Sequence, residues 1–348
     1  MSTLAGSLVS VPPAEAAKAA GLVYASTDAP GLRRRRRGGG FVYVDPDGRK
    51  VSDRQVLERI YRLVIPPAWR DVWICADPQG HIQAVGVDDR GRRQYRYHDD
   101  FRAVRDAAKF EHLIAFAEAL PRLRRRVAAD MAKPGLRRDK VLATVVLLLE
   151  TTLIRVGNPE YARKNRSYGL TTLNARHATL AGSEVRFHFT GKSGKQWRLG
   201  VRDRRVARIV RSCQELPGQA LFKYLDERGD PQAVTSADVN AYLKQATGAD
   251  VTAKDFRTWR GTVMAAHALA ERAATGEGPS KRGVSAVIKE VAARLGNTAA
   301  ICRKCYVHPD IIEAYLAGEL FLPKGPHSPE LDADEAAVLA FLRHRAAA

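Results

Sequence analysis

The spacing of apolar residues changes near residue 100, and this change restricts the possible folds more than any other feature of the sequence. Before it, short runs such as Phe41–Val44 and Val72–Cys75 alternate with turn signals such as Asp45–Gly48, a pattern typical of strands. After it, the apolar residues over 110–120 recur every three or four positions, as on a helix. The sequence therefore predicts an α+β fold, with a small β-rich domain followed by a larger, mainly helical one.

The chain has 348 residues, enough for two compact domains. We expect four segments: a flexible tail over 1–20, a β-rich N-terminal domain over 21–98, a helical domain over 99–325 and a C-terminal helix or tail over 326–348. The tail is expected because Ala, Ser and Pro dominate it. The last segment is expected to be an exposed helix.

Local signals predict individual elements within these segments. A helix is expected over about 52–63, with Ser52 or Asp53 as its N-cap. Pro121 is expected to end the first helix of the second domain, because proline interrupts helical hydrogen bonding. A buried helix is predicted over 139–152.

A hairpin and a further helix are also predicted in the helical domain. Apolar and polar residues alternate over 185–201, on both sides of the turn Gly191–Lys195. Two glycines make this turn mobile, and it carries two lysines. An apolar stripe over 284–295 predicts a helix that Gly296 closes.

Positive charge is in large excess. Lysine and arginine number 57 against 38 aspartates and glutamates, which gives a net charge of +19 and an isoelectric point near 10.1. This excess favours a polyanionic partner such as nucleic acid, but it does not by itself choose between DNA, RNA and an anionic membrane. Five consecutive arginines, Arg33–Arg37, precede three glycines. They are predicted to form a flexible segment, either a solvated charge run or a clamp on phosphates, and the overall charge favours the clamp.

The sequence argues against a membrane protein and against a disulfide-bonded one. The longest apolar run, Val141–Leu149, has about half the length of a spanning helix, and the N-terminus lacks the pattern of a secretory signal. Four cysteines in a chain of this size fit a reducing cytoplasm. Cys302 and Cys305 have the spacing of metal ligands, but no second pair of Cys or His completes a zinc site. We interpret them as ordinary thiols.

Cleaving a phosphodiester without a metal requires a particular set of side chains. The non-bridging oxygens share a negative charge that increases in the transition state, so fixed cations are needed, and arginine offers a planar pair of donors that stays protonated. A nucleophile and a proton donor for the departing sugar oxygen complete the set. A suitable set therefore consists of two arginines, a lysine, one further donor and a nucleophile.

Six segments of the chain carry a resemblance to known proteins, in chain order Ile65–Trp69, Gly91–Tyr97, Leu149–Asn158, Phe189–Lys195, Lys254–Trp259 and Leu295–Tyr306. They resemble the corresponding segments of poxvirus and bacterial type IB DNA topoisomerases. Each one alone is a weak signal, but the six occur in the order and spacing of that family, from about residue 20 to about residue 325. The resemblance implies the fold shared by tyrosine recombinases and type IB topoisomerases, with a DNA-binding N-terminal domain and a helical catalytic domain.

The resemblance also implies roles for five residues. Tyr306 would attack the phosphorus and become linked to the 3′ phosphate. Arg155 and Arg257 would hold the non-bridging oxygens, and Lys192 would protonate the leaving 5′ oxygen. Asn297 stands where many members of the family carry a histidine that bonds a phosphate oxygen. Its amide can donate the same bond, but it carries no charge.

These roles imply an isomerase that needs no cofactor. The phosphotyrosyl ester keeps the energy of the broken bond, so rejoining needs no ATP, and arginines replace an obligatory metal, although a divalent cation could stimulate. The expected reaction is nicking, rotation of the free end and religation, which removes supercoils of either sign. The expected partner is double-stranded DNA, with the two domains forming a clamp around it. The resemblance implies that the protein acts as a monomer on the nucleoid, in the cytoplasm and not at a membrane.

Six further residues are expected to contact DNA: Arg92, Gln94, Tyr95, Tyr97, Tyr161 and Lys254. Tyr95 and Tyr97 should share one face of a strand, and Gln94 could read a base edge. Tyr161 follows Asn158 and Glu160, which occupy places where the viral enzymes carry lysines. A glutamate that faces DNA weakens phosphate attraction, so we do not expect the sequence preference of the viral enzymes here.

Two alternatives stay open at this stage. A tyrosine recombinase uses a similar set of residues but usually carries a histidine three positions before the second arginine, where this chain has Lys254. A non-catalytic DNA-binding protein could keep the fold, although the presence of both arginines, the lysine and the tyrosine argues against it. Each of these residues alone also has a structural interpretation, such as a salt bridge for Arg155 or stacking of Arg257 on Trp259. Their joint occurrence favours catalysis.

Overall fold

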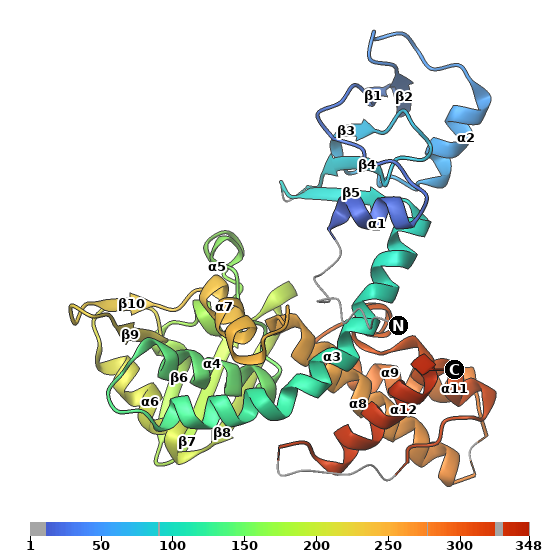
Figure 1. The fold of residues 1–348 in the computed structure, drawn as a ribbon. Coiled ribbons are helices and arrows are strands. Elements are labelled where there is room, and N and C mark those ends of the chain that lie inside the picture. Colours follow the sequence, from blue (N-terminus) through green and yellow to red (C-terminus); the bar gives the residue numbers. More distant parts are fainter. Residues whose placement is uncertain (1–11, 90, 277, 324–329, 348) are drawn as a thin grey trace, which may run out of the picture. The chain divides into compact units, whose positions relative to one another are not determined.

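The computed structural model describes residues 12–89, 91–276, 278–323 and 330–347. Their secondary structure confirms the predicted α+β class: five antiparallel strands come early in the chain, and helices dominate the rest (Figure 1). The chain divides into two compact units, whose described residues cover 12–111 and 112–347. The division falls within helix α3 (Asp99–Ala132).

The first unit is built on a five-stranded antiparallel sheet with the strand order β2-β1-β3-β4-β5. The strands are β1 (Leu32–Arg37), β2 (Gly40–Val44), β3 (Arg70–Ile74), β4 (Ile82–Val87) and β5 (Arg93–Tyr97). Helix α2 (Arg54–Arg62) covers one face, where Ile60 packs against Leu32 and Ile74. The Asp53 carboxylate accepts the backbone N–H groups of the first turn, which confirms the predicted helix and its N-cap.

The prediction of a flexible arginine run is wrong, because Arg33–Arg37 belong to strand β1. Alternation along the strand explains how five arginines can join a sheet, since only every second side chain must face the core. Arg34 lies on the core side, where its guanidinium donates to the carbonyls of Ile65 and Trp69 and lies 4.2 Å from the ring centroid of Phe41. These hydrogen bonds satisfy the backbone carbonyls of the proline-containing loop over 65–69, and they stabilise the partly buried charge of Arg34.

Residues 13–19 also differ from the predicted loose tail. They form helix α1 (Pro13–Ala19), which has a proline in its first turn, where a missing N–H costs nothing. Ala16 and Ala17 are fully buried against Phe101 and Leu22. Alanine is a strong helix former and small enough to pack closely, so a composition typical of a tail can also form a docked helix. Residues 1–11 of the predicted tail lie outside the described part of the chain.

The second unit is mainly helical, and its longest helix does not end where predicted. Helix α3 continues through Pro121 to Ala132. Leu113, Leu120 and Leu123 on either side of the proline are almost fully buried, so tertiary packing outweighs the one hydrogen bond that proline removes. Helix α4 (Arg138–Thr152) confirms the predicted buried helix over 139–152.

The remaining elements of the second unit follow α4 in the chain. The α-helices are α5 (Pro159–Asn165), α6 (Arg204–Glu215), α7 (Ser236–Thr247), α8 (Ala253–Ala274), α9 (Lys281–Leu295), α10 (Ala299–Tyr306), α11 (Pro309–Ala317) and α12 (Ala333–Ala347). The strands are β6 (Ala178–Ala181), β7 (Glu184–Thr190), β8 (Gln196–Arg202), β9 (Lys223–Leu225) and β10 (Pro231–Ala233). Strands β7 and β8 form the predicted hairpin, and β6 extends it to three strands.

The C-terminal helix is present as predicted, but it is packed and not exposed. Glu335 on α12 is 2% exposed and accepts hydrogen bonds from Arg124 of α3 and from the indole N–H of Trp259 on α8. Arg124 also pairs with Glu150 of α4, so these two carboxylates compensate its buried charge. Sequence periodicity does not reveal this network, because its partners are up to 211 positions apart. Among the residues described, none of the helices combines the length and the apolar character needed to cross a membrane.

The role of Arg34 in fixing β1 can be tested by hydrogen exchange. Arg34→Gln removes a charged donor from the loop carbonyls, so we expect the opening free energy of the β1 and β2 amides to fall by about 1.5–3 kcal/mol. Arg35→Gln removes the same charge from the opposite side and should leave exchange nearly unchanged. Equal protection of the β1 and β2 amides in the two variants would contradict the role of Arg34 in fixing β1.

Candidate active site

Four of the five residues with predicted roles come together within the second unit. Arg155 lies just after α4, and Arg257 lies in the first two turns of α8. Asn297 follows the C-cap of α9, and Tyr306 is the last residue of α10. Four separate elements therefore supply the cluster, which is why the sequence can suggest its members but not their distances.

A left-handed turn and a close glycine contact position Arg155. Helix α4 ends at Leu153, which adopts φ 58°, so the chain turns sharply before Arg155. Two residues later Gly157 adopts φ 106°, and a Cβ on Gly169 would lie 2.6 Å from the Cα of Gly157. Only glycine permits this approach, and it lets the Arg155 carbonyl accept the N–H of Leu170 at 2.9 Å. The backbone of Arg155 is thereby held between two segments.

Arg155 in turn fixes the orientation of Asn297. Its guanidinium donates to the amide oxygen of Asn297. Because arginine can only donate, the oxygen must face it, and the amide nitrogen must point elsewhere. That nitrogen is buried and has no hydrogen-bond partner among the described residues. Gly296, at φ 65°, and a bond from the Asn297 N–H to the Ala292 carbonyl hold the backbone. The arrangement presents a preset donor suited to an anionic oxygen.

Arg257 is the most buried member of the cluster. Its side chain is 3% exposed and donates to the carbonyls of Leu153 and Leu295, the residues at the ends of α4 and α9. Its guanidinium carbon lies 5.1 Å from the ring centroid of Tyr306. Burial and then the nearby charge of Arg155 lower the pKa of Arg257 to about 10, while Tyr306 opposes the shift. A pKa of about 10 leaves the guanidinium charged at neutral pH, and its buried Nε has no partner within the described chain.

Helix α8 also positions the nucleophile candidate through a residue that the sequence analysis missed. Gly261 lies one turn after Arg257, and a Cβ there would overlap the carbonyl oxygen of Tyr306. The next residue, Thr262, accepts the N–H of His308 at 3.1 Å. Glycine inside a helix is unfavourable by about 1 kcal/mol relative to alanine, and this cost was the available sign of a packing requirement. Gly261 and Thr262 thus bring the end of α10 onto α8 beside Arg257.

Lys192 does not reach this cluster. It is exposed in a 3₁₀ turn, Lys192–Gly194, at the tip of the β7–β8 hairpin, and its ammonium makes no hydrogen bond or ion pair with the residues described. The hairpin contacts the last turn of α9 through Lys195 instead, whose ammonium donates to the carbonyl of Ala293 at 2.9 Å. The structure therefore brings together Arg155, Arg257, Asn297 and Tyr306 and leaves Lys192 in solvent.

Of the predicted DNA contacts, four lie on or next to β5 of the first unit. Tyr95 and Tyr97 are exposed, with ring centroids 5.9 Å apart, and share one face of the strand as predicted. Gln94 and Arg92 both bond to the carboxylate of Asp88, at 2.9 and 2.7 Å. Asp88 therefore orients both side chains and partly neutralises the charge of Arg92.

The other two predicted contacts belong to the second unit. Tyr161 is exposed on α5, the short helix that Asn158 caps through its side-chain oxygen. Glu160 pairs with Lys164 at 2.7 Å, so its charge is locally compensated. Lys254 is exposed in the first turn of α8.

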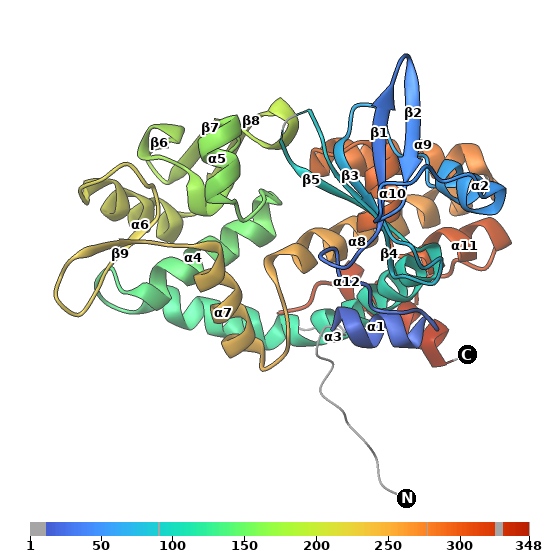
Figure 2. The same ribbon diagram turned by 90° about the horizontal axis from the view of Figure 1, so that it is seen from above.

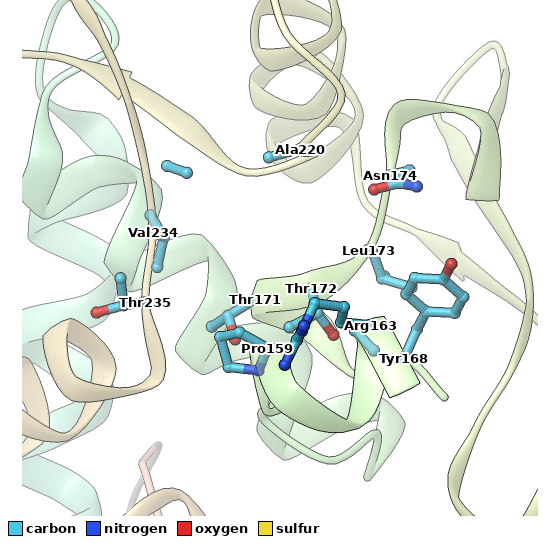
Figure 3. Close-up of a pocket in the computed structure, with 12 residues that line it drawn as sticks. Pro159, Arg163, Tyr168, Thr171, Thr172, Leu173, Asn174, Ala220, Val234 and Thr235 are labelled. Atoms are coloured by element: carbon cyan, nitrogen blue, oxygen red, sulfur yellow. The ribbon is translucent and has the colours of Figure 1, made fainter. Parts of the chain in front are cut away.

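A cavity of about 410 Å³ lies beside α5 and contains none of the five residues with predicted roles (Figure 3). Tyr168, Thr171 and Thr235 are among its lining residues. The Thr171 hydroxyl donates to the carbonyl of Val156, the residue after Arg155, at 2.8 Å. The cavity therefore lies behind the segment that carries Arg155, and it is distinct from the cluster.

The two cysteines of α10, Cys302 and Cys305, lie in different environments. Cys302 is fully buried, and this burial raises the pKa of its thiol to about 11, while Cys305 is half-buried. Within the described residues, no group of three or more His, Cys, Asp or Glu side chains could hold a metal ion.

Comparisons with known proteins identify relatives of this chain. A family model described as the catalytic core of eukaryotic DNA topoisomerase I matches residues 98–317, and one described as the N-terminal domain of bacterial DNA topoisomerase IB matches residues 40–88. The chain is 31% identical over 293 residues to DNA topoisomerase 1B of Acanthamoeba polyphaga mimivirus, a match that covers 82% of this chain and 87% of that protein. It is 24% identical over 235 residues to DNA topoisomerase 1B of Vaccinia virus (strain Copenhagen), covering 66% and 71%.

The packing role of Gly261 predicts an unusual response to alanine. In an ordinary helix this substitution stabilises by about 1 kcal/mol. Here the added methyl group forces α8 and the end of α10 apart, so we expect Gly261→Ala to lower the free energy of unfolding by about 1–2 kcal/mol, as overpacked sites do. Denaturant unfolding measures the change. An unchanged or raised stability would contradict the close contact.

Proposed function

This chain belongs to the type IB DNA topoisomerase family, and on that premise we propose that it breaks and rejoins one strand of duplex DNA through Tyr306. The observation that carries the proposal is the cluster itself. A tyrosine lies 5.1 Å from a buried guanidinium, beside a second arginine that is bonded to an asparagine with a free amide donor. Such a set can stabilise the charge of a pentacoordinate phosphorus without a metal.

In the proposed cleavage step the phenol oxygen of Tyr306 attacks the backbone phosphorus. The bond between this oxygen and phosphorus forms as the bond to the 5′ oxygen breaks, which leaves a 3′ phosphotyrosyl ester. The phenol proton passes to water, and the 5′ oxygen takes a proton from Lys192 to become a free 5′ hydroxyl. Arg155 and Arg257 bind the non-bridging oxygens. The step reverses when the 5′ hydroxyl attacks the ester, and rotation of the free end between the two steps relaxes supercoils of either sign. The exchange of one ester for another needs no ATP and no obligatory metal, and a divalent cation acts at most as a stimulant.

We assign to Asn297 the donor role that a histidine fills in many members of the family. Support comes from its contact with Arg155, which turns the amide N–H₂ away from the guanidinium. A donor fixed before the reaction spends no energy on reorientation in the transition state. Because an amide does not titrate, this contribution should not change with pH between 5 and 8.

Lys192 is proposed to protonate the leaving 5′ oxygen after the hairpin tip moves. The tip is suited to motion, because Lys192 is exposed and Ser193 and Gly194 adopt positive φ of 63° and 76°. The docked Lys195 keeps the base of the turn on α9. A short displacement around this anchor would bring Lys192 over bound DNA.

The proposed partner is double-stranded DNA, bound through Tyr95 and Tyr97 of the first unit and Tyr161 and Lys254 of the second, with Arg92 and Gln94 beside the tyrosines. The net charge of +19 supports attraction to a polyanion. We further propose that the protein acts as a monomer and that it works on the nucleoid in the cytoplasm.

Relaxation of a supercoiled plasmid tests the proposal most simply. In EDTA and without ATP, the protein should convert positively and negatively supercoiled plasmid to relaxed topoisomers on a gel. Tyr306→Phe should lose this activity and keep its affinity for DNA. A plasmid that stays supercoiled would refute the proposed function, and retained activity in Tyr306→Phe would place the nucleophile elsewhere.

The contribution of Asn297 is tested by single-turnover cleavage. Asn297→Ala removes the proposed oxyanion donor, so we expect the rate to fall by about 100-fold, the lower range for loss of such a donor. Gln55→Ala, an exposed change on α2, serves as the control and should keep the rate. A fall of less than threefold in Asn297→Ala would exclude a direct role for the amide.

Two assays separate the alternatives. A denaturing gel of the protein after incubation with labelled DNA shows whether a covalent adduct forms, and its absence would favour a non-catalytic DNA-binding protein. Incubation with two DNA sites shows whether strands are exchanged between them, which a recombinase would do and a topoisomerase would not.

A further inference from the structure

The five arginines of β1 divide into two sets with different environments. Side chains directly opposite one another in an antiparallel pair lie on the same face of the sheet. Leu32 lies opposite Ile74, and both belong to the core under α2. Arg34, two residues along the strand, shares this face and is fully engaged with the loop carbonyls. Arg33, Arg35 and Arg37 therefore face away from α2.

The face away from α2 also carries the residues of β5 that the proposed function assigns to DNA. Arg33 lies opposite Trp73 on β3, Trp73 lies opposite Val85 on β4, and Val85 lies opposite Tyr95. One face of the sheet thus runs from the arginines of β1 to the tyrosines of β5. The segment over 25–29 covers its middle, where the Ala29 carbonyl accepts the indole N–H of Trp73 at 3.0 Å. Both ends of this face stay exposed.

The outer part of β1 forms a two-stranded ribbon with β2. Strand β3 pairs only with Leu32 and Arg33, so Arg34–Arg37 pair with β2 alone. Figure 2 shows this ribbon extending past the other strands of the sheet. The ribbon over 32–44 has no acidic residue. The side chains of Arg33, Arg35 and Arg37 are exposed and make no hydrogen bond or ion pair with the described residues.

We propose that the β1–β2 ribbon is a phosphate-binding element, in which Arg33, Arg35 and Arg37 lie along the backbone of the bound duplex and Arg34 holds the ribbon rigid. The proposal rests on the proposed function and extends it to a segment that the cleavage chemistry does not use. Alternate residues of a strand are spaced by about 6.8 Å, so the three guanidinium groups span about 14 Å. Over this length one strand of B-DNA presents about four phosphates.

Rigidity is what distinguishes this element from a charged tail. A disordered arginine run loses backbone conformational entropy when it binds, at every residue that becomes fixed. The backbone of β1 is already fixed by its pairing with β2 and by Arg34, so the ordering cost is confined to side chains. The ribbon should therefore contribute several phosphate contacts at a defined place, on the same face of the sheet as Tyr95 and separated from β5 by two strands.

The salt dependence of DNA binding tests the proposal. Binding is measured in a Tyr306→Phe background, which prevents cleavage. The variant Arg33→Gln/Arg35→Gln/Arg37→Gln should make the negative slope of log K against log salt less steep by up to about 2.7, at about 0.9 for each lost phosphate contact. Between about 50 and 200 mM salt, its affinity should then fall about 40-fold less than that of the parent. The matched control, Arg62→Gln/Arg208→Gln/Arg211→Gln, removes the same charge from exposed arginines outside this face, which also make no ion pair with the described residues, and should change the slope by less than one third as much.

The outcomes separate this proposal from the proposed function. Equal slopes in the parent and the ribbon variant, or equal reductions in the ribbon and control variants, would overturn the ribbon assignment while plasmid relaxation by the wild type remained intact. Binding to vesicles of anionic phospholipid that the ribbon variant loses, with an unchanged DNA slope, would assign the arginines to a membrane surface and also overturn it. Absence of plasmid relaxation in the wild type would instead contradict the proposed function, because the binding slopes are measured without cleavage.

Discussion

The burial of the Arg257 guanidinium is the interaction on which the rest of the site depends. A buried charge is strongly unfavourable unless hydrogen bonds compensate it. Here the acceptors are the carbonyls of Leu153 and Leu295, at the ends of α4 and α9. Terminal carbonyls lack partners within their own helices and carry the negative end of the helix dipole, so they suit a cation. Arg155 and Asn297 each lie two residues after one of these carbonyls. The Arg257 side chain therefore holds in place the two backbone segments that carry Arg155 and Asn297.

The same burial explains how the cluster could act on a phosphate. Burial and the nearby charge of Arg155 lower the pKa of Arg257, because both disfavour a second positive charge at this place. An anion placed between the two guanidinium groups would relieve this repulsion, and the free donors at Arg257 Nε and Asn297 Nδ2 are available to bind it. The nucleophile must also lie close to these cations. Gly261 makes this possible, because the absence of a side chain lets the end of α10 pack on α8 and place Tyr306 against Arg257.

The sequence predicted those parts of the fold that follow from local patterns. Strand alternation, the turn at Asp45–Gly48, the cap at Asp53 and the hairpin around Gly191–Lys195 were all recognisable, because each depends on neighbouring residues. Motif resemblance named Arg155, Arg257, Asn297 and Tyr306, which the structure brings together, and Lys192, which it leaves outside the cluster. The errors concern features that distant contacts decide: Arg34 joins a sheet because of loop carbonyls more than 30 residues away, and α3 passes through Pro121 because its flanks are buried.

The central claim is that a metal-free cationic cluster directs Tyr306 to exchange bonds with a DNA phosphorus. The most direct measurement is mass spectrometry of the peptide that stays bound to DNA after reaction, in EDTA, with an oligonucleotide duplex whose cleaved 5′ end diffuses away. We predict a single nucleotide-bearing peptide with a 3′ phosphate ester on Tyr306. An adduct on any other residue, a 5′ linkage, or an adduct that forms only when a divalent metal is added would contradict the account.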